Sequence, residues 1–442
     1  MCSFLFTTKN ITDLNYVNYY QKFRGPDKTS VLEDTENGFS FIHNLLSITG
    51  EFREQPFVKD NIVCMFNGEI YNYLDYGDYK SDGECLIDLY LEYGDTFTKK
   101  LDGEFAIVLV DYDEKKLIVS TDVFATKPLW ISLNQGIGVA SYYSSLNRLG
   151  FYNIKKIDAN TTEVYSLEER KLLNKSSIFD FDLDQHIDSY DRWIEAFGKS
   201  IRKRSSGVRE KIFIGLSSGY DSGAIGRELH NQNVLFKGYS IIGKENKEVL
   251  EDRCQILKNT QIIKMNQNTF YDVKSYLDNH CENYLNDGGG RMLNDKATAG
   301  LGYISNLANK DGYKIYLSGQ GADEIISDYG WNGYKIYPHS QFGGYFPADL
   351  NDIFPWESFY EGTQIDYINK EECVAGTYGI ETRYPFLDTN LVQEFLWITQ
   401  NLKNKRYKSA IAEYLSYEKF PFDENAKCGF NPTLNEYQPI RV

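Results

Sequence analysis

The sequence predicts a chain of two domains, a strand-rich first half followed by a second half of the α/β class. The chain has 442 residues, and at roughly 150 residues per domain this length allows two or three domains with cores of their own. Short runs rich in tyrosine and β-branched residues, broken by turn signals, occupy about the first 165 residues. From Arg192 onward, strand candidates alternate with longer segments of helical spacing, which is typical of parallel strands joined by helices.

The boundary between the halves is predicted in a polar, charged segment, residues 165–191, that has no sustained period of 2 or 3.6 residues. We assign residues 1–186 to a first domain with its trailing linker and residues 187–442 to a second domain. A third zone, residues 328–362, is rich in aromatic residues and glycine and is too long for an ordinary connection, so we expect a lid or a specificity insert there. The main strand candidates are residues 61–66, 105–110, 116–120, 211–216, 235–242 and 313–317.

Composition and charge exclude several classes of function. The net charge of −16 and the lack of a basic stripe argue against binding to nucleic acid or to an anionic membrane surface. No apolar stretch approaches the roughly 20 residues that span a bilayer, and no basic-then-apolar leader is present, so a soluble, cytoplasmic protein is predicted. Seven cysteines without a C-x-x-C pair and five scattered histidines indicate no disulfide framework, zinc knuckle or serine–histidine triad. No redox cofactor is predicted.

Cys2 directly follows the initiator methionine. Removal of that methionine would leave a thiol beside its own α-amino group, whose ordinary pKa is about 7.7–8.0. A useful fraction of this amine is neutral at neutral pH, so one residue can supply both nucleophile and base. A cysteine at this position is by itself more often accidental, and the motifs that follow decide between the two interpretations.

Cys2 is followed by short motifs in a fixed order: RGPD at 24–27, HNLLSI at 43–48, QP at 55–56, NGEIYN at 67–72, SDGE at 81–84, LDGEF at 101–105 and KPL at 127–129. Together they resemble the glutaminase domain of class II glutamine amidotransferases, in the form found in asparagine synthetases. The resemblance implies an α+β Ntn-hydrolase sandwich of two antiparallel sheets with helices. It also implies hydrolysis of glutamine to glutamate and ammonia through a cysteinyl thioester.

The resemblance assigns roles by position. Cys2 corresponds to the nucleophile, and the side-chain amide of Asn67 and the backbone N–H of Gly68 correspond to the oxyanion-hole donors. Removal of one such donor typically lowers the rate by about 10²- to 10³-fold. Glu69 and Asp82 correspond to the acidic residues that hold the ammonium group of glutamine.

One position departs from the family pattern. The family normally has an arginine where this chain has Leu45, and that arginine pairs with the α-carboxylate of glutamine. A leucine cannot form this bidentate pair. Arg24 and Arg53 are the candidates to replace it, and Arg24 is included in the predicted glutamine site.

In the second half, residues 211–216 form an apolar run that leads into SSGYDSG at 217–223, and a helical pattern begins at 224–229. A strand, a turn of small residues and a helix N-terminus form an anion site, because backbone N–H groups and the helix dipole favour phosphate. The segment resembles the S-G-G-L-D-S-S pyrophosphate loop of the synthetase domain of asparagine synthetases. It differs at Ser218, Tyr220 and Gly223.

A second strand candidate, residues 313–317, ends in SGQGADE at 318–324, which resembles the family loop S-G-x-G-[AS]-D-E. The resemblance implies a parallel-sheet domain like that of adenine nucleotide α-hydrolases, which uses ATP and Mg²⁺. Asp221 and Asp323 would hold the Mg²⁺ ion against the pyrophosphate. The residues predicted to bind ATP or pyrophosphate are Leu216, Ser217, Gly219, Ser222, Ser240, Ser318 and Gly319.

Two later motifs complete the resemblance, YGIETRYPFLD at 378–388 and KCGF at 427–430. Lys427 is predicted to stabilise charge on the acyl-adenylate, and Lys408 fits a further family lysine. Glu381 either positions substrate, serves as a base or forms a structural salt bridge with Arg383. Gln320 stands where well-studied relatives have glutamate, and an amide is a poor base at neutral pH.

The sequence therefore predicts a two-domain amidotransferase that makes an amide from a carboxylate, with AMP and pyrophosphate as co-products. Asparagine from aspartate is the default product. Amidation of another carboxylate, and a glutamine- or nucleotide-sensing protein without catalysis, are the alternatives. The expected partners are small molecules (glutamine, ATP and the acceptor), with a homodimer as an open possibility.

Overall fold

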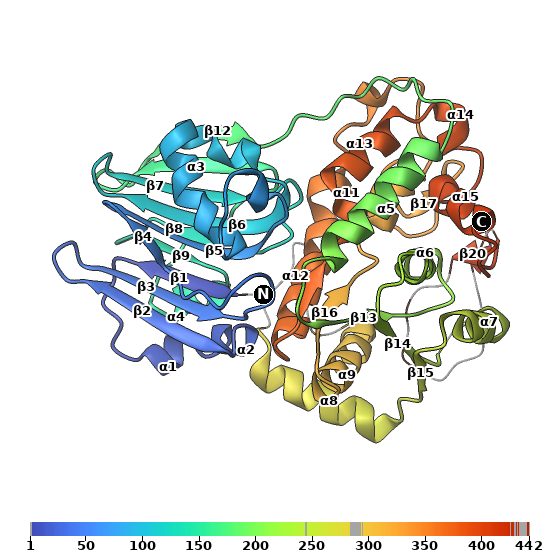
Figure 1. The fold of residues 1–442 in the computed structure, drawn as a ribbon, viewed down its shortest axis with the longest axis horizontal. Coiled ribbons are helices and arrows are strands. Elements are labelled where there is room, and N and C mark those ends of the chain that lie inside the picture. Colours follow the sequence, from blue (N-terminus) through green and yellow to red (C-terminus); the bar gives the residue numbers. More distant parts are fainter. Residues whose placement is uncertain are drawn as a thin grey trace.

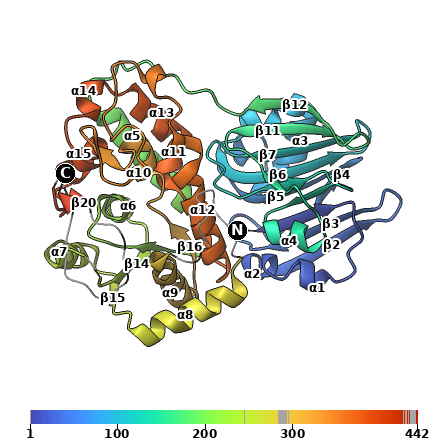
Figure 2. The ribbon, with the colours of Figure 1, turned by 180° about the vertical axis from the view of Figure 1, so that it is seen from behind.

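The structure, a computed structural model, describes residues 2–243, 245–282, 293, 295–424, 426–427, 430, 432 and 440–441. Figure 1 shows a strand-rich half, blue to cyan-green, beside a half in which helices surround a smaller sheet, green to red. The N-terminus lies at the junction of the halves in this view and in the view from behind (Figure 2). In the described part of the chain, no helix has the length and hydropathy that a membrane span requires.

Two antiparallel sheets of six strands each make up the first half, which confirms the predicted sandwich. The strand orders are β10-β8-β9-β1-β3-β2 and β12-β11-β7-β6-β5-β4. The first sheet consists of β1 (Ser3–Thr7), β2 (Lys28–Asp34), β3 (Phe39–Leu45), β8 (Trp130–Ser132), β9 (Gly138–Ala140) and β10 (Lys155–Lys156). The second consists of β4 (Phe57–Lys59), β5 (Ile62–Ile70), β6 (Gly103–Asp111), β7 (Lys116–Thr121), β11 (Thr161–Ser166) and β12 (Leu172–Ser177).

Strand β6 is apolar from Phe105 to Val110 because both of its faces are covered there. Phe105, Ile107 and Leu109 belong to a core cluster that includes residues of helix α3 (Cys85–Tyr93). Ala106 and Val108 alternate with them and belong to the cluster between the two sheets. Since side chains of a strand alternate between its faces, a central strand buried on both sides requires this unbroken apolar run.

A five-stranded sheet in the order β15-β14-β13-β16-β19 forms the centre of the second half, and all of its neighbouring strands are parallel. This confirms the predicted α/β class. From β13 the chain adds β14 and β15 on one side of the sheet, and it then adds β16 and β19 on the other side. The strand order therefore reverses between β13 and β16, and parallel sheets bind ligands at such a switch point. The strands are β13 (Lys211–Gly215), β14 (Phe236–Ile241), β15 (Thr260–Ile263), β16 (Tyr313–Leu317) and β19 (Glu381–Arg383).

Helices cover both sheet systems, and helix α12 extends along the junction between the halves in Figure 1. The helices of the first half besides α3 are α1 (Leu14–Val17), α2 (Gln21–Arg24) and α4 (Tyr143–Arg148). Those of the second half are α5 (Asp191–Ser205), α6 (Tyr220–Asn231), α7 (Lys247–Leu257), α8 (Gln267–His280), α9 (Lys296–Lys310), α10 (Ala322–Ile326), α11 (Glu357–Tyr360), α12 (Gly362–Gly376), α13 (Thr389–Trp397), α14 (Gln400–Lys403) and α15 (Ser409–Tyr417).

The predicted strands correspond to β5, β6, β7, β13, β14 and β16, with differences at their ends. The largest difference is at β5, which continues through the NGE motif to Ile70. The sequence gives no signal for β15 or β19, which have only four and three residues. The predicted domain division at residue 186 falls between β12 and α5, where the chain crosses from one half to the other, and it stays a prediction.

The aromatic zone at residues 328–362 is a folded segment that contains two short strands, β17 (Gly330–Trp331) and β18 (Tyr334–Lys335), and helix α11. One carboxylate oxygen of Asp328 organises it by accepting hydrogen bonds from the Ser340 hydroxyl and from the backbone N–H groups of Gln341 and Phe342, at 2.7–3.0 Å. Its buried aromatic rings, among them Trp356, pack in the core of the second half.

Candidate active sites

The Cys2 thiol lies at the start of β1, a strand held between β3 and β9. Its Sγ is 3.8 Å from the carbonyl oxygen of Leu46, and the side chain is only 7% exposed. Burial raises the pKa of the Cys2 thiol to about 11. The thiol is therefore protonated at neutral pH and needs a base to become a nucleophile. Met1, whose removal would free the Cys2 amine, lies outside the described residues.

Asn67 and Gly68 lie within β5, not in a hairpin turn. Among the described residues, neither the amide nitrogen nor the amide oxygen of the fully buried Asn67 side chain has a hydrogen-bond partner. Buried polar groups are normally paired, so an orphan donor of this kind indicates a missing ligand. Gly68 has φ +138°, and a Cβ atom there would lie 1.8 Å from the carbonyl oxygen of Glu104. Only glycine fits this position.

Gly68→Ala is expected to destabilise the first half strongly, because β5 must separate from β6 to admit the methyl group. We expect a fall in the free energy of unfolding of about 4 kcal/mol or more, measured by urea denaturation. Gly38→Ala is the matched control, since Gly38 also has positive φ (+70°) but has no atom within 4 Å of its added Cβ. The control is expected to cost about 1–2 kcal/mol, and equal losses in the two variants would contradict the steric argument.

The predicted substrate-binding acids Glu69 and Asp82 meet two residues of the second half. Arg383 of β19 lies 2.8 Å from a carboxylate oxygen of Glu69 and donates through Nε to Glu381 at 2.6 Å. Burial raises the pKa of Glu69 well above its usual value and that of Asp82 to about 7. Although burial opposes ionisation of Glu381, positive neighbours that include Arg383 hold its pKa at about 2. Glu381 thus lies in the salt bridge and does not line the cavity at the carboxyl ends of β13 and β16.

The two arginines expected to compensate for Leu45 are already paired with other groups. Arg24 is buried, donates from Nε to the carbonyl oxygen of Cys2 at 2.8 Å and forms an ion pair with Glu372 of α12. Arg53 is 41% exposed and pairs with Glu51 and Glu84 at the surface. Arg24 is therefore positioned to fix the backbone at Cys2, and its guanidinium is not directed at an open substrate site.

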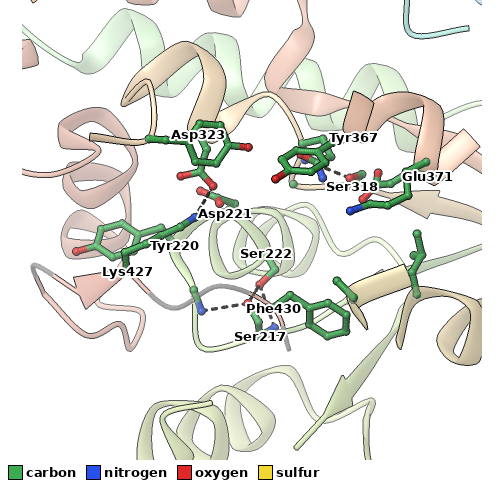
Figure 3. A pocket seen from close by; sticks show the side chains of 18 of the residues that line it. Ser217, Tyr220, Asp221, Ser222, Ser318, Asp323, Tyr367, Glu371, Lys427 and Phe430 are labelled. Carbon is green, nitrogen blue, oxygen red and sulfur yellow. Dashed lines mark hydrogen bonds and ion pairs between the residues drawn. The ribbon is translucent and has the colours of Figure 1, made fainter. Parts of the chain in front are cut away.

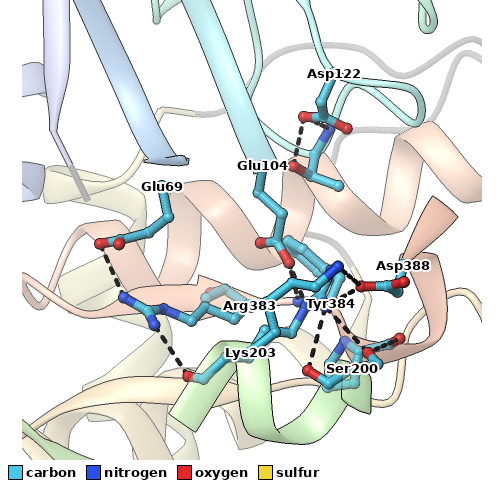
Figure 4. A network of polar contacts seen from close by, with 12 residues as sticks. Glu69, Glu104, Asp122, Ser200, Lys203, Arg383, Tyr384 and Asp388 are labelled. Carbon is cyan, nitrogen blue, oxygen red and sulfur yellow. Dashed lines mark hydrogen bonds and ion pairs between the residues drawn. The ribbon is translucent and has the colours of Figure 1, made fainter. Parts of the chain in front are cut away.

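Buried charges also join the two halves beside this site (Figure 4). Glu104 of β6 accepts a hydrogen bond from Arg204 of α5 at 2.7 Å and another from the backbone N–H of Tyr384 at 3.0 Å. Arg204 pairs in turn with Asp388 at 2.9 Å. These pairs could not be predicted from local sequence patterns, because their members are 100 to 280 positions apart. Loss of one partner from such a buried pair leaves an uncompensated charge.

The second site is a cavity of about 440 Å³ at the carboxyl ends of β13 and β16, the switch point of the parallel sheet. The loop after β13 is held by its own serines, because the hydroxyl groups of Ser217 and Ser222 are 2.8 Å apart. The N–H of Gly219, the N-cap of α6, donates to the Ser217 hydroxyl at 3.1 Å. The N-terminus of α6 therefore meets the cavity at the predicted phosphate loop.

Two carboxylates and two lysines gather at one side of this cavity (Figure 3). Nζ of Lys408 lies 2.7 Å from Asp221 and 2.8 Å from Asp323, and Lys427 forms an ion pair with Asp323. Although burial opposes ionisation of Asp323, these two lysines hold its pKa far below its usual value. Lys408 adopts a left-handed backbone with φ +46°, a conformation that costs energy and is concentrated at functional sites.

The donor set fits a magnesium ion that is shared with phosphate. Among the described residues, no cluster of three or more histidine, cysteine, aspartate or glutamate side chains could hold a metal by itself. Mg²⁺ commonly takes one or two carboxylates and completes its octahedron with phosphate oxygens and water. Asp221 and Asp323 would supply those two carboxylates beside the predicted phosphate loop.

The other predicted nucleotide-site residues divide into two groups. Ser318 and Gly319 line the cavity, whereas Leu216 and Ser240 do not. The Leu216 side chain is packed in the core, and the Ser240 hydroxyl is buried and lacks a partner among the described residues. Phe430 also lines the cavity, but Cys428 and Gly429 of the same motif lie outside the described residues.

The sequence did not indicate most of the residues that line the opposite wall of this cavity. The aromatic zone supplies Tyr329, Tyr337 and His339, and helix α12 supplies Tyr367 and Glu371. The length and aromatic content of residues 328–362 did indicate a special role for that zone. Nothing in the sequence of α12 distinguishes its cavity-facing residues from its other buried residues.

Comparisons with known proteins agree with both halves. A family model described as "Glutamine amidotransferase domain" matches residues 1–180. Asparagine synthetase [glutamine-hydrolyzing] 2 of Lotus japonicus and the nodule asparagine synthetase [glutamine-hydrolyzing] of Pisum sativum are each 24% identical, over 91% of this chain and 70% of the relative. A Methanocaldococcus jannaschii protein provisionally named asparagine synthetase [glutamine-hydrolyzing] 1 is 26% identical over 85% of this chain and 72% of the relative.

Among solved structures, glutamine phosphoribosylpyrophosphate amidotransferase from B. subtilis, complexed with ADP and GMP, aligns with a TM-score of 0.32 and 14% identity. The alignment covers 87% of this chain and 90% of that one. The sequence relatives match along most of the chain, across the antiparallel sheets of the first half and the parallel sheet of the second. Residues 1–180 therefore match the glutamine amidotransferase domain, and most of the chain is similar to proteins named asparagine synthetase [glutamine-hydrolyzing].

Proposed function

We propose that the chain is a carbon–nitrogen ligase that takes nitrogen from glutamine and joins it to a carboxylate activated by ATP. The activated species is an acyl-adenylate, so AMP and pyrophosphate are the co-products. Aspartate is the proposed acceptor and asparagine the product, in line with the names of the relatives.

A single residue, Arg383, carries the argument that the two halves act together. Its guanidinium pairs with Glu69 at 2.8 Å, in the half that contains Cys2. Its backbone carbonyl accepts a hydrogen bond from the N–H of Ser318 at 2.9 Å, in the loop that lines the nucleotide cavity. Arg383 therefore contacts both the half that contains Cys2 and the loop that lines the cavity, which supports transfer of a small nitrogen species between them.

In the first half, the proposed chemistry begins when the freed amine of Cys2 takes the thiol proton. The thiolate attacks the side-chain carbonyl of glutamine, and the amide of Asn67 and the N–H of Gly68 stabilise the oxyanion that forms. Ammonia leaves, and water hydrolyses the remaining thioester to glutamate. Arg24 acts as a positioning residue, since it donates to the carbonyl oxygen of Cys2.

In the second half, the loop of Ser217, Gly219 and Ser222 and the N-terminus of α6 are proposed to bind the pyrophosphate portion of ATP. Asp221 and Asp323 would hold Mg²⁺, which supplies positive charge against the departing pyrophosphate. Lys427 would stabilise the charge that develops at the activated carboxylate. Attack of the acceptor carboxylate on the α-phosphorus then forms the acyl-adenylate. A nitrogen nucleophile can attack the carbonyl carbon of this activated species.

The direct test is a product assay with a panel of carboxylates that includes aspartate and glutamate. The protein is incubated with Mg-ATP and each acceptor, with glutamine or ammonium as donor, and AMP, pyrophosphate and amide are measured. We expect the three products in equal amounts with aspartate. Amide formed from another acceptor would show that the chain is an amidotransferase for a carboxylate other than aspartate. Tight nucleotide binding without turnover on any acceptor would favour a sensing protein.

A further inference from the structure

In the part of the chain that the structure describes, the buried carboxylate of Glu371 has no complete set of partners. Glu371 lies on α12, lines the nucleotide cavity and is only 6% exposed. The side chains of Ser318 and Gln320 hydrogen-bond its carboxylate, but oxygen Oε2 has no partner within the described part of the chain. A buried carboxylate oxygen without a partner is costly to keep, so its position indicates a partner that comes from outside the chain.

Neighbouring charges do not neutralise Glu371 directly. The nearest cation along the helix, Lys370, is bound to Asp295 at 2.8 Å. The other ionisable groups that interact electrostatically with Glu371 are Glu372 of α12, Tyr316 of β16 and Tyr384, which follows β19. Burial raises the pKa of Glu371 to about 7, a value suited to a group that accepts a proton near neutral pH.

Helix α12, which carries Glu371, also contacts the half that contains Cys2. The adjacent residue, Glu372, points the other way and binds Lys127 of the first half at 3.1 Å as well as Arg24, whose Nε holds the Cys2 carbonyl. Glu371 therefore lies on the part of the cavity wall formed by the helix that also contacts the half containing Cys2. In Figure 3 Glu371 and Ser318 lie at the opposite side of the pocket from Lys427.

We propose that Glu371 is a catalytic residue that accepts a proton from the nitrogen nucleophile as the nucleophile enters the cavity. The inference rests on the proposed function. One N–H bond of the incoming ammonium breaks and its proton goes to the carboxylate of Glu371. The nitrogen lone pair then forms the C–N bond, and the C–O bond to AMP breaks with its electron pair on AMP. A second proton passes from the nitrogen to the phosphate of the departing AMP, which leaves the neutral amide.

The test compares ammonium with hydroxylamine as nucleophile in Glu371→Gln, with aspartate and Mg-ATP present. Hydroxylamine is a much weaker base than ammonia and is mainly neutral near neutral pH, so it does not need Glu371. We expect ammonium-dependent amide formation to fall by about 10²-fold or more, while hydroxamate formation and ATP–pyrophosphate exchange stay within about twofold of the parent. Glu371→Asp is expected to recover part of the ammonium activity.

Glu361→Gln is the matched control, because it makes the same change at an exposed glutamate next to the start of α12. The inference is overturned if Glu371→Gln uses ammonium as well as the parent does. It is also overturned if both nucleophiles lose activity equally, or if only the KM for aspartate rises. A parent protein without ATP–pyrophosphate exchange on any acceptor would instead overturn the proposed function, and the role of Glu371 with it.

Discussion

Cys2→Ala is expected to abolish amide formation from glutamine and to leave amide formation from ammonium close to that of the parent. The thiol is the only proposed nucleophile for glutamine, and the cavity proposed to bind nucleotide is lined by residues of the second half. Loss of an essential nucleophile commonly lowers the rate by about 10⁴-fold or more. The measurement is the rate of AMP and amide formation with each nitrogen donor at saturating acceptor.

Cys254→Ala is the control for this variant, since Cys254 is a half-buried free cysteine on α7, in the other half of the molecule. It is expected to use both donors like the parent. Equal glutamine-dependent rates for Cys2→Ala and the parent would reject Cys2 as the nucleophile. Intact-mass measurement of the parent adds an independent check, because the mechanism requires a chain that begins at Cys2.

The second large effect is expected for Lys427→Met, which removes a buried positive charge beside Asp323. Tyr407 and Lys408 would still contact Asp323, so the carboxylate keeps partners and the loop keeps its support. If Lys427 stabilises charge at the activated carboxylate, ATP–pyrophosphate exchange should fall by about 10²-fold or more. Hydrolysis of glutamine in the first half should change much less.

Lys310→Met makes the same change at an exposed lysine at the end of α9 and is expected to have no effect on exchange. A Lys427→Met variant with parental exchange would show that this lysine serves only to balance the charge of Asp323. Separate assays of exchange and of glutamine hydrolysis distinguish that result from a general loss of folding.

Much of each candidate site was predictable because its residues are close together in the sequence. Asn67 and Gly68 are adjacent on one strand, and Ser217 to Ser222 form one turn between β13 and α6. The spacing of residues within a turn or a strand fixes their geometry locally, so a short motif carries the chemistry with it. Leu216 and Ser240 show the limit of this reasoning, because position in a motif does not say which way a side chain faces.

The sequence by itself determined the order of the two halves, their principal strands and the loops at the ends of β13 and β16. It did so because apolar runs, turn residues and helix starts act over a few neighbouring positions. Only the tertiary structure decided that Arg383 pairs with Glu69. It also decided that Glu371 lines the cavity at the ends of β13 and β16 and that Glu381 does not. Those positions depend on how β19 pairs with β16 and how α12 packs between the halves, which are contacts between residues tens to hundreds of positions apart.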